Sequence, residues 1–98
     1  MYGTVARCRV RPGSEEAYIE LSKRWNRERG PQVPGFIAEY VYHSEANPGE
    51  FFACLLFESR DAYLRNAGDP EEDRWYQRFR ELMEADAEWN DGQVVNHA

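Results

Sequence analysis

The sequence contains few of the residues that bind metals or form cross-links. It has two cysteines and two histidines, and His97 is the last residue but one. A protein-only metal site with three histidine ligands therefore cannot form within one chain, and no metal is predicted. Cys8 and Cys54 lie in apolar stretches without metal-like spacing, which favours buried free thiols over a disulfide or a reactive pair. A reducing, cytoplasmic location fits such thiols.

Positive charge is also scarce. Twelve Lys and Arg residues stand against 18 Asp and Glu residues, and the formal net charge is -6. A chain this acidic is repelled by nucleic-acid phosphates and by anionic membrane surfaces, so neither partner is expected. The sequence has no run near the roughly 18 apolar residues of a membrane span and no signal-peptide core at its N-terminus.

No motif in the sequence specifies a reaction. It contains no G-x-G-x-x-G, P-loop, H-E-x-x-H, C-x-x-C or G-x-S-x-G. We therefore predict no bound cofactor. Repeats, low-complexity tracts and linkers are absent too, so residues 1–98 are predicted to form a single domain. A domain of this length buries only about 60 to 65 per cent of its unfolded surface, and a partner subunit would add stability.

The most informative stretch that is present begins at Phe51. The residues from Phe51 to Glu58 are apolar on both alternating faces apart from the last, which is typical of a central strand covered on both sides. Ser59 then stands at an N-cap position, because its side-chain oxygen can accept the unpaired amide hydrogens of a first turn. The strand is therefore predicted to run directly into a helix, which ends at Gly68.

A second helix is predicted directly after Gly68. Asp69 is placed at its N-cap, Pro70 at its first position, and Glu72 three residues after the cap, where it completes a capping box. The helix carries large apolar residues at spacings of three and four, a stripe that faces either a core or a ligand. These residues are Trp75, Tyr76, Phe79, Leu82 and Met83.

The other segments complete the order of elements. Residues 2–11 alternate as a strand. Ser14 is predicted to cap a helix that ends before Gly30, and residues 36–43 form an aromatic-rich strand. Asn47-Pro48-Gly49 supplies the turn of a hairpin to the central strand. A short terminal strand is predicted after Gly92, in residues 93–98.

This order of elements predicts an α+β fold. It is a ferredoxin-like βαββαβ antiparallel sheet with helices on one face, and residues 2–11 and 51–58 lie at its centre. The other face is then bare, although the central strand is apolar on both sides. The economical cover is the same face of a second copy, so we predict a homodimer.

Several local patterns together resemble the antibiotic biosynthesis monooxygenase family of dimeric α/β barrels. They are "VPGF", the Asn-Pro-Gly hairpin, the strand ending "LFES" in which Phe57 replaces the family's usual Trp, "RDAYLRN", and the break into an aromatic helix. The resemblance covers about residues 4–96. The haem-degrading branch of the family is excluded, because its Asn, Trp and axial His fall here on Ala6, Asn66 and Tyr76.

The resemblance implies a cofactor-independent monooxygenase acting on a small aromatic, quinol or polyketide-like substrate. Such an enzyme needs a base, donors that hold an oxyanion and an apolar cavity. A polyketide cyclase-like enzyme needs much the same enclosure. A non-catalytic binder of small aromatic or quinone-like ligands, or a purely structural dimer, is the alternative from another class.

Candidate site residues are those expected around a pocket between the helices and the sheet. His43 is the best candidate base, unless it is a solvated residue at a strand end. Tyr40 is a candidate phenol at the pocket wall, and Asn66 lies where the helix breaks, either at the pocket mouth or as a terminator. The candidate substrate-binding residues, which alternatively form a packed core or solvated termini, are Ala6, Cys8, Tyr18, Trp25, Tyr42, Arg65, Trp75, Tyr76 and Phe79.

Two arginines of the first strand are expected on the face away from the helices. Arg7 and Arg9 alternate with the apolar residues of that strand. They are predicted to pair with Glu39 or Glu58, or else to form an anion-binding patch.

Overall fold

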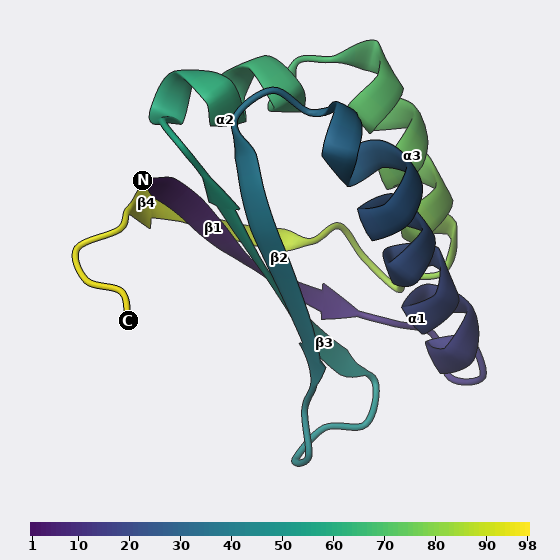
Figure 1. Cartoon of the computed structure of the whole chain (residues 1–98). Coiled ribbons are helices and arrows are strands. Elements are labelled where there is room, and N and C mark those ends of the chain that lie inside the picture. The colour runs from purple at the N-terminus through teal and green to yellow at the C-terminus, as the bar shows by residue number, and fades with distance from the viewer.

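Four antiparallel strands form one open sheet in the order β2-β3-β1-β4, and the helices cover one of its faces (Figure 1). The structure is a computed structural model that describes residues 1–98. Its elements are β1 (Tyr2–Arg9), α1 (Glu15–Arg24), a π-helical turn (Trp25–Arg29), a 3-10 turn (Gly30–Gln32), β2 (Phe36–His43), β3 (Glu50–Phe57), α2 (Arg60–Ala67), α3 (Pro70–Glu81) and β4 (Glu88–Gln93). The predicted ferredoxin-like α+β fold is confirmed, with β1 and β3 at the centre. None of the helices is long and apolar enough to cross a lipid bilayer.

Two of the predicted helix caps are present, and two are not. The Ser59 hydroxyl accepts a hydrogen bond from the Ala62 amide at 3.1 Å, and the Asp69 carboxylate accepts one from the Glu71 amide at 2.9 Å. Ser14, in contrast, makes no side-chain cap bond. The predicted capping box at Glu72 is also wrong, because this side chain turns away from the helix end and contacts the π-helical turn.

The last strand begins earlier in the chain than predicted. β4 pairs with β1 from Arg7↔Glu88 to Tyr2↔Gln93, so most of it lies before Gly92, in the acidic segment. Val95, in the predicted strand, is 95% exposed. The sequence pattern fails here because every residue of β4 is exposed and no apolar alternation marks the strand.

A β-bulge at the start of β2 determines which side chains face the helices. Phe36 pairs with Phe57, but Ala38 already pairs with Leu56, so one extra residue is inserted between them. Phe36 therefore packs on Trp25 on the helix side, while Tyr40 lies on the opposite side. Uninterrupted alternation along residues 36–43 would have predicted that Phe36 shares a face with Tyr40 and Tyr42, and the bulge overturns this expectation.

The side of the sheet away from the helices carries an apolar and aromatic surface, which we call the open face. The strand pairing places Val5, Arg7, Ala38, Tyr40, Tyr42, Phe52, Cys54 and Leu56 on it. Tyr40 and Tyr42 are 66% and 54% exposed. Arg7 pairs here with Glu50 at 2.8 Å and Glu88 at 2.7 Å. The predicted pairing with Glu39 is wrong, because Glu39 lies on the other side of the sheet.

A glycine directly before the bulge is predicted to be essential for this geometry. Gly35 has φ +79°, and a Cβ there would lie 2.6 Å from the Ala62 Cβ. Gly35→Ala should therefore lower the free energy of unfolding by about 2–3 kcal/mol in urea denaturation. Gly13→Ala is the matched control, since Gly13 has φ +89° but open space within 4 Å of where its Cβ would lie, and it should cost only about 1 kcal/mol. Equal losses in the two variants would contradict this role of Gly35.

Candidate functional site

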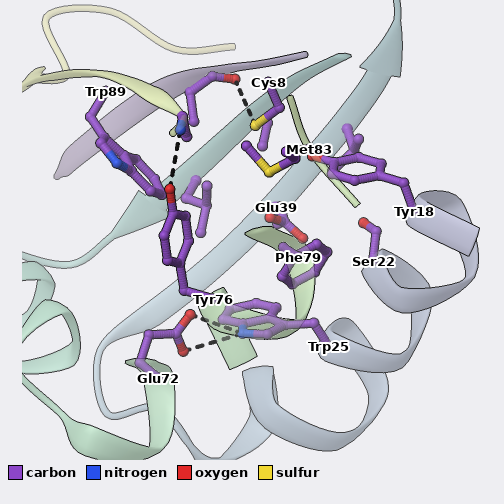
Figure 2. Close-up of a pocket in the computed structure, with 15 residues that line it drawn as sticks. Cys8, Tyr18, Ser22, Trp25, Glu39, Glu72, Tyr76, Phe79, Met83 and Trp89 are labelled. Carbon is purple, nitrogen blue, oxygen red and sulfur yellow. Dashed lines mark hydrogen bonds between the residues drawn. The ribbon is translucent and has the colours of Figure 1, made fainter. Parts of the chain in front are cut away.

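A cavity of about 60 Å³ lies between the helix side of the sheet and helices α1 and α3 (Figure 2). Twelve of its 15 lining residues are hydrophobic. Strands β1 and β3 supply small side chains at its floor, Ala6, Cys8 and Ala53, which leave room beneath the helices. The remaining lining residues are Tyr18, Ser22, Trp25, Glu39, Val41, Leu55, Glu72, Tyr76, Phe79, Met83, Ala87 and Trp89.

Six of the residues predicted from the sequence meet in this cavity. They are Ala6, Cys8, Tyr18, Trp25, Tyr76 and Phe79. Tyr18 packs edge-on against Phe79 with ring centroids 5.6 Å apart, which joins α1 to α3 over the cavity. The side-chain periods of β1 and the helices were sufficient to place these six residues together.

The structure places the predicted tyrosines of β2 outside the cavity. Tyr40 and Tyr42 lie on the open face, and Tyr42 stacks on Phe52 with ring centroids 5.1 Å apart. The sheet separates them from the cavity, because the β2 residues that line the cavity are Glu39 and Val41, on the helix side.

The predicted base His43 also lies outside the cavity. Its ring stacks on that of Phe51 with ring centroids 4.2 Å apart, and its Nε2 atom contacts the Pro48 carbonyl. His43 lines a neighbouring surface groove of about 300 Å³ together with Lys23 and Asn26. Ser22 and Val41 line both spaces, so the groove and the cavity adjoin.

Arg65, Asn66 and Trp75 occupy other places. Arg65 and Asn66 line a separate groove of about 310 Å³, and the Asn66 side-chain carbonyl accepts a hydrogen bond from Arg29 at 2.9 Å. Trp75 is 7% exposed and belongs to the second core cluster, with the Arg78 guanidinium 4.5 Å from its ring centroid. For Trp75 the packed-core alternative describes the structure.

Among the cavity residues that the sequence reasoning missed, Glu39 has the most unusual environment. Its Oε1 atom is buried and has no hydrogen-bond partner. Burial raises the pKa of this carboxyl to about 7, the charge of Glu72 adds to the rise, and a hydrogen bond from the Asn26 side chain acts against it. The signal available in the sequence was its position two residues before Val41, because residues two apart in a strand lie on the same face.

Glu72 is the second carboxyl at the cavity wall, and it is firmly held. It accepts hydrogen bonds from the Trp25 Nε1 atom at 3.1 and 3.2 Å and from the Arg29 Nε atom at 3.2 Å. Trp25 and Arg29 are the first and last residues of the π-helical turn, so this turn directs both side chains toward α3. Arg29 donates further bonds to Asn66 and Asp69.

The other polar groups of the cavity are uncharged near neutral pH. Burial is the main cause that raises the pKa values of Cys8, Tyr18 and Tyr76. Tyr76 is already occupied, because its hydroxyl donates to Asp86 and accepts from the Ala87 amide, each at 3.1 Å. Tyr18 and Ser22 direct their hydroxyl groups inward (Figure 2). No group of three or more His, Cys, Asp or Glu side chains is arranged to hold a metal ion.

Comparisons with known proteins agree with this architecture. A model of the family described as "Antibiotic biosynthesis monooxygenase" matches residues 1–78. SnoaB, a cofactor-independent oxygenase from Streptomyces nogalater, has a similar structure with a TM-score of 0.84, 16% identity, and coverage of 98% of this chain and 94% of SnoaB. Rv0793 from Mycobacterium tuberculosis has a TM-score of 0.81 at 20% identity, over 99% and 97% of the two chains. No curated protein matches the sequence.

The buried carboxyl of Glu39 is predicted to make the stability of the fold depend on pH. Below the ordinary carboxyl value of 4.5 the group is protonated whether the chain is folded or not. As the pH rises from there to about 7, the unfolded chain ionises first, so the folded state loses stability by up to roughly 3 kcal/mol. Glu39→Gln removes this loss, so its gain over the wild type should grow between about pH 4.5 and pH 8.

Urea denaturation at several pH values measures that gain. Glu45→Gln is the matched control, because it removes one negative charge from an exposed loop residue. A stability difference between Glu39→Gln and the wild type that stays constant with pH would show that Glu39 does not carry this effect.

Proposed function

Because the chain belongs to the antibiotic biosynthesis monooxygenase family, we propose that it is a cofactor-independent monooxygenase that oxidises a small hydroxyarene with dioxygen in this cavity. The environment of the Glu39 carboxyl is the observation on which this proposal rests. This carboxyl lies in an apolar wall, has one buried oxygen atom without a partner, and has a pKa of about 7. A base is most effective when its pKa lies near the working pH.

The reaction draws its electrons from the substrate, as 1-naphthol illustrates. Glu39 accepts the hydroxyl proton, and the aryloxide passes one electron to dioxygen. The resulting radical and superoxide join through a ring carbon–oxygen bond, and the peroxide takes the proton back from Glu39. Cleavage of the O–O bond, with loss of the ring hydrogen and hydroxide as water, leaves a carbonyl. One naphthol and one dioxygen therefore give one naphthoquinone and one water.

Two neutral hydroxyl groups support the anionic stages of this chemistry. Tyr18 and Ser22 line the cavity on the α1 side. The pKa of Tyr18 is raised, chiefly by burial, so the phenol keeps its proton and can donate it in a hydrogen bond to an aryloxide. Donors fixed in a water-poor site stabilise a developing oxyanion more strongly than water does.

The size of the cavity favours small substrates. Its volume of about 60 Å³ is well below the roughly 150 Å³ that encloses a benzene molecule, so an aromatic ligand requires rim side chains to move. Trp89 is 50% exposed and its ring centroid lies 6.0 Å from that of Tyr76. Movement of this exposed ring opens the cavity for one or two fused rings more readily than for a long polycyclic compound.

Oxygen uptake with 1-naphthol tests the proposed function. The purified chain should consume dioxygen and form naphthoquinone in equal amounts, and kcat/KM should rise with pH to a plateau above about 7, where Glu39 is ionised. Glu39→Gln should lower kcat by at least about 100-fold, because the base is lost, whereas Glu45→Gln should not.

The rival base is tested in the same assay. A large loss in His43→Gln together with an unchanged rate in Glu39→Gln would assign the base to His43 instead. Ligand binding without oxygen uptake would favour a non-catalytic binder, and a ring-closed product formed without oxygen uptake would favour a cyclase.

We also propose that a second copy of the chain covers the open face. This face is apolar over the central strand β3, and its two exposed tyrosines lie beside that strand. A contiguous apolar surface of this kind on so small a domain marks an interface, and pairing of equivalent faces closes the assembly.

Sedimentation equilibrium should therefore show a dimer at micromolar concentration. Tyr40→Glu should weaken it by at least about tenfold, because a charge would enter an apolar interface. Leu64→Glu is the matched control, since Leu64 is 44% exposed but lies on α2, away from the open face. A monomeric wild type would contradict the proposed interface.

A further inference from the structure

The cavity contains carboxyl groups but no basic side chain. Among its 15 lining residues, Glu39 and Glu72 are the acidic ones, and no Lys, Arg or His is present. The thiol of Cys8 and the phenols of Tyr18 and Tyr76 stay neutral, because their pKa values are raised. Any net charge that a ligand meets inside the cavity is therefore negative.

Glu72 holds its negative charge in a fixed position. Its partners, the Trp25 indole and the Arg29 guanidinium, are donors only, and they already supply three hydrogen bonds. Burial raises the pKa of Glu72, while Arg29 and Trp25 act against that rise. The Arg29 side chain is only 7% exposed and does not line the cavity, so it compensates the charge from behind.

The two carboxyl groups therefore differ in what they can do. Glu39 has a buried oxygen atom without a partner and can accept a hydrogen bond or a proton from a ligand. Both oxygens of Glu72 already accept from Trp25 or Arg29, so this carboxyl acts on a ligand mainly through its charge. In a poorly screened cavity, a second negative charge near Glu72 is repelled, and Arg29 offsets part of this repulsion, so binding should weaken by about tenfold or more.

We propose that Glu72 is a specificity-determining residue that makes the cavity reject carboxylates and other anions and admit its ligand as an uncharged hydrogen-bond donor. This inference rests on the proposed function, because it specifies the form in which the hydroxyarene enters. It also explains why Arg29 is buried behind the wall, where it fixes Glu72 without offering a cation to the ligand.

Benzamide and benzoate test this charge selection, because they have nearly the same shape and differ in charge. Chemical-shift titrations at about pH 6 keep the proton on Glu39, whose pKa is about 7, while benzoate is ionised. The wild type should bind phenol and benzamide. It should bind benzoate at least about tenfold more weakly than benzamide. Glu72→Gln should lower the ratio of benzamide affinity to benzoate affinity by about tenfold, because the repulsion is lost while Gln can still accept from Trp25.

Asp69→Asn is the matched control variant. Asp69 binds the same Arg29 at 3.1 Å, but its side chain is 42% exposed and it does not line the cavity. Asn is an equally good helix N-cap, so the fold should be kept. This variant removes one negative charge from the Arg29 network and should leave the ratio of benzamide affinity to benzoate affinity at its wild-type value.

Several results would overturn the proposal. They are a wild type that binds benzoate as tightly as benzamide, an unchanged ratio in Glu72→Gln, or the same change in Asp69→Asn. Tight benzoate binding by the wild type overturns the proposal even if Glu72→Gln does not fold, but only a lower ratio in Glu72→Gln assigns the selection to Glu72, because an apolar cavity itself disfavours an anion. Binding is measured without turnover, so the two proposals can fail separately. Charge selection without oxygen uptake would overturn the proposed function alone. Failure of phenol and benzamide to bind would overturn the proposed function and the charge selection together.

Discussion

The alternation of side chains along β2, shifted once by the bulge between Phe36 and Ala38, is the constraint on which the site depends. Side chains of a strand point to opposite faces in turn, so one extra residue exchanges the faces of everything on one side of it. Phe36 can then join the core under Trp25, while Glu39 still faces the helices and Tyr40 the open side. The cavity and the open face are thus two results of a single register.

A buried arginine connects the helices around this sheet. A charge with a side-chain exposure of 7% is strongly unfavourable unless it is paired, and Arg29 is bound by Asn66, Asp69 and Glu72. These partners come from the end of α2 and the start of α3. The same network that fixes the helix junction therefore also places a carboxylate at the cavity wall. Asn66, which the sequence suggested as catalytic, has a structural contact in this network.

The sequence predicts those parts of the fold that depend on local patterns. The apolar β3, the caps at Ser59 and Asp69 and the small residues Ala6 and Cys8 on the helix side of β1 follow from spacing alone. β4 has no such pattern, since its position comes from backbone pairing with β1 and its residues are exposed.

The site is less predictable, because its environment is assembled from distant segments. Nothing adjacent to Glu39 in the sequence shows that burial will raise its pKa, which depends on the bulge and on helix packing. Glu72 stands three residues after an N-cap, where a capping role is the ordinary expectation, but Trp25 and Arg29 compete for it from the π-helical turn.

The contrast between the two carboxyl groups is the strongest structural argument that the cavity has a function. A domain of 98 residues has modest stability. Glu72 is compatible with this modest stability, because its partners are hydrogen-bond donors that stabilise its charge. Glu39 instead lowers that stability at neutral pH, because its carboxyl is desolvated and its buried Oε1 atom has no hydrogen-bond partner. An apolar residue at this position would pack against Val41 and Leu55 without that cost, and the cost is consistent with the proton-transfer role that we propose for Glu39.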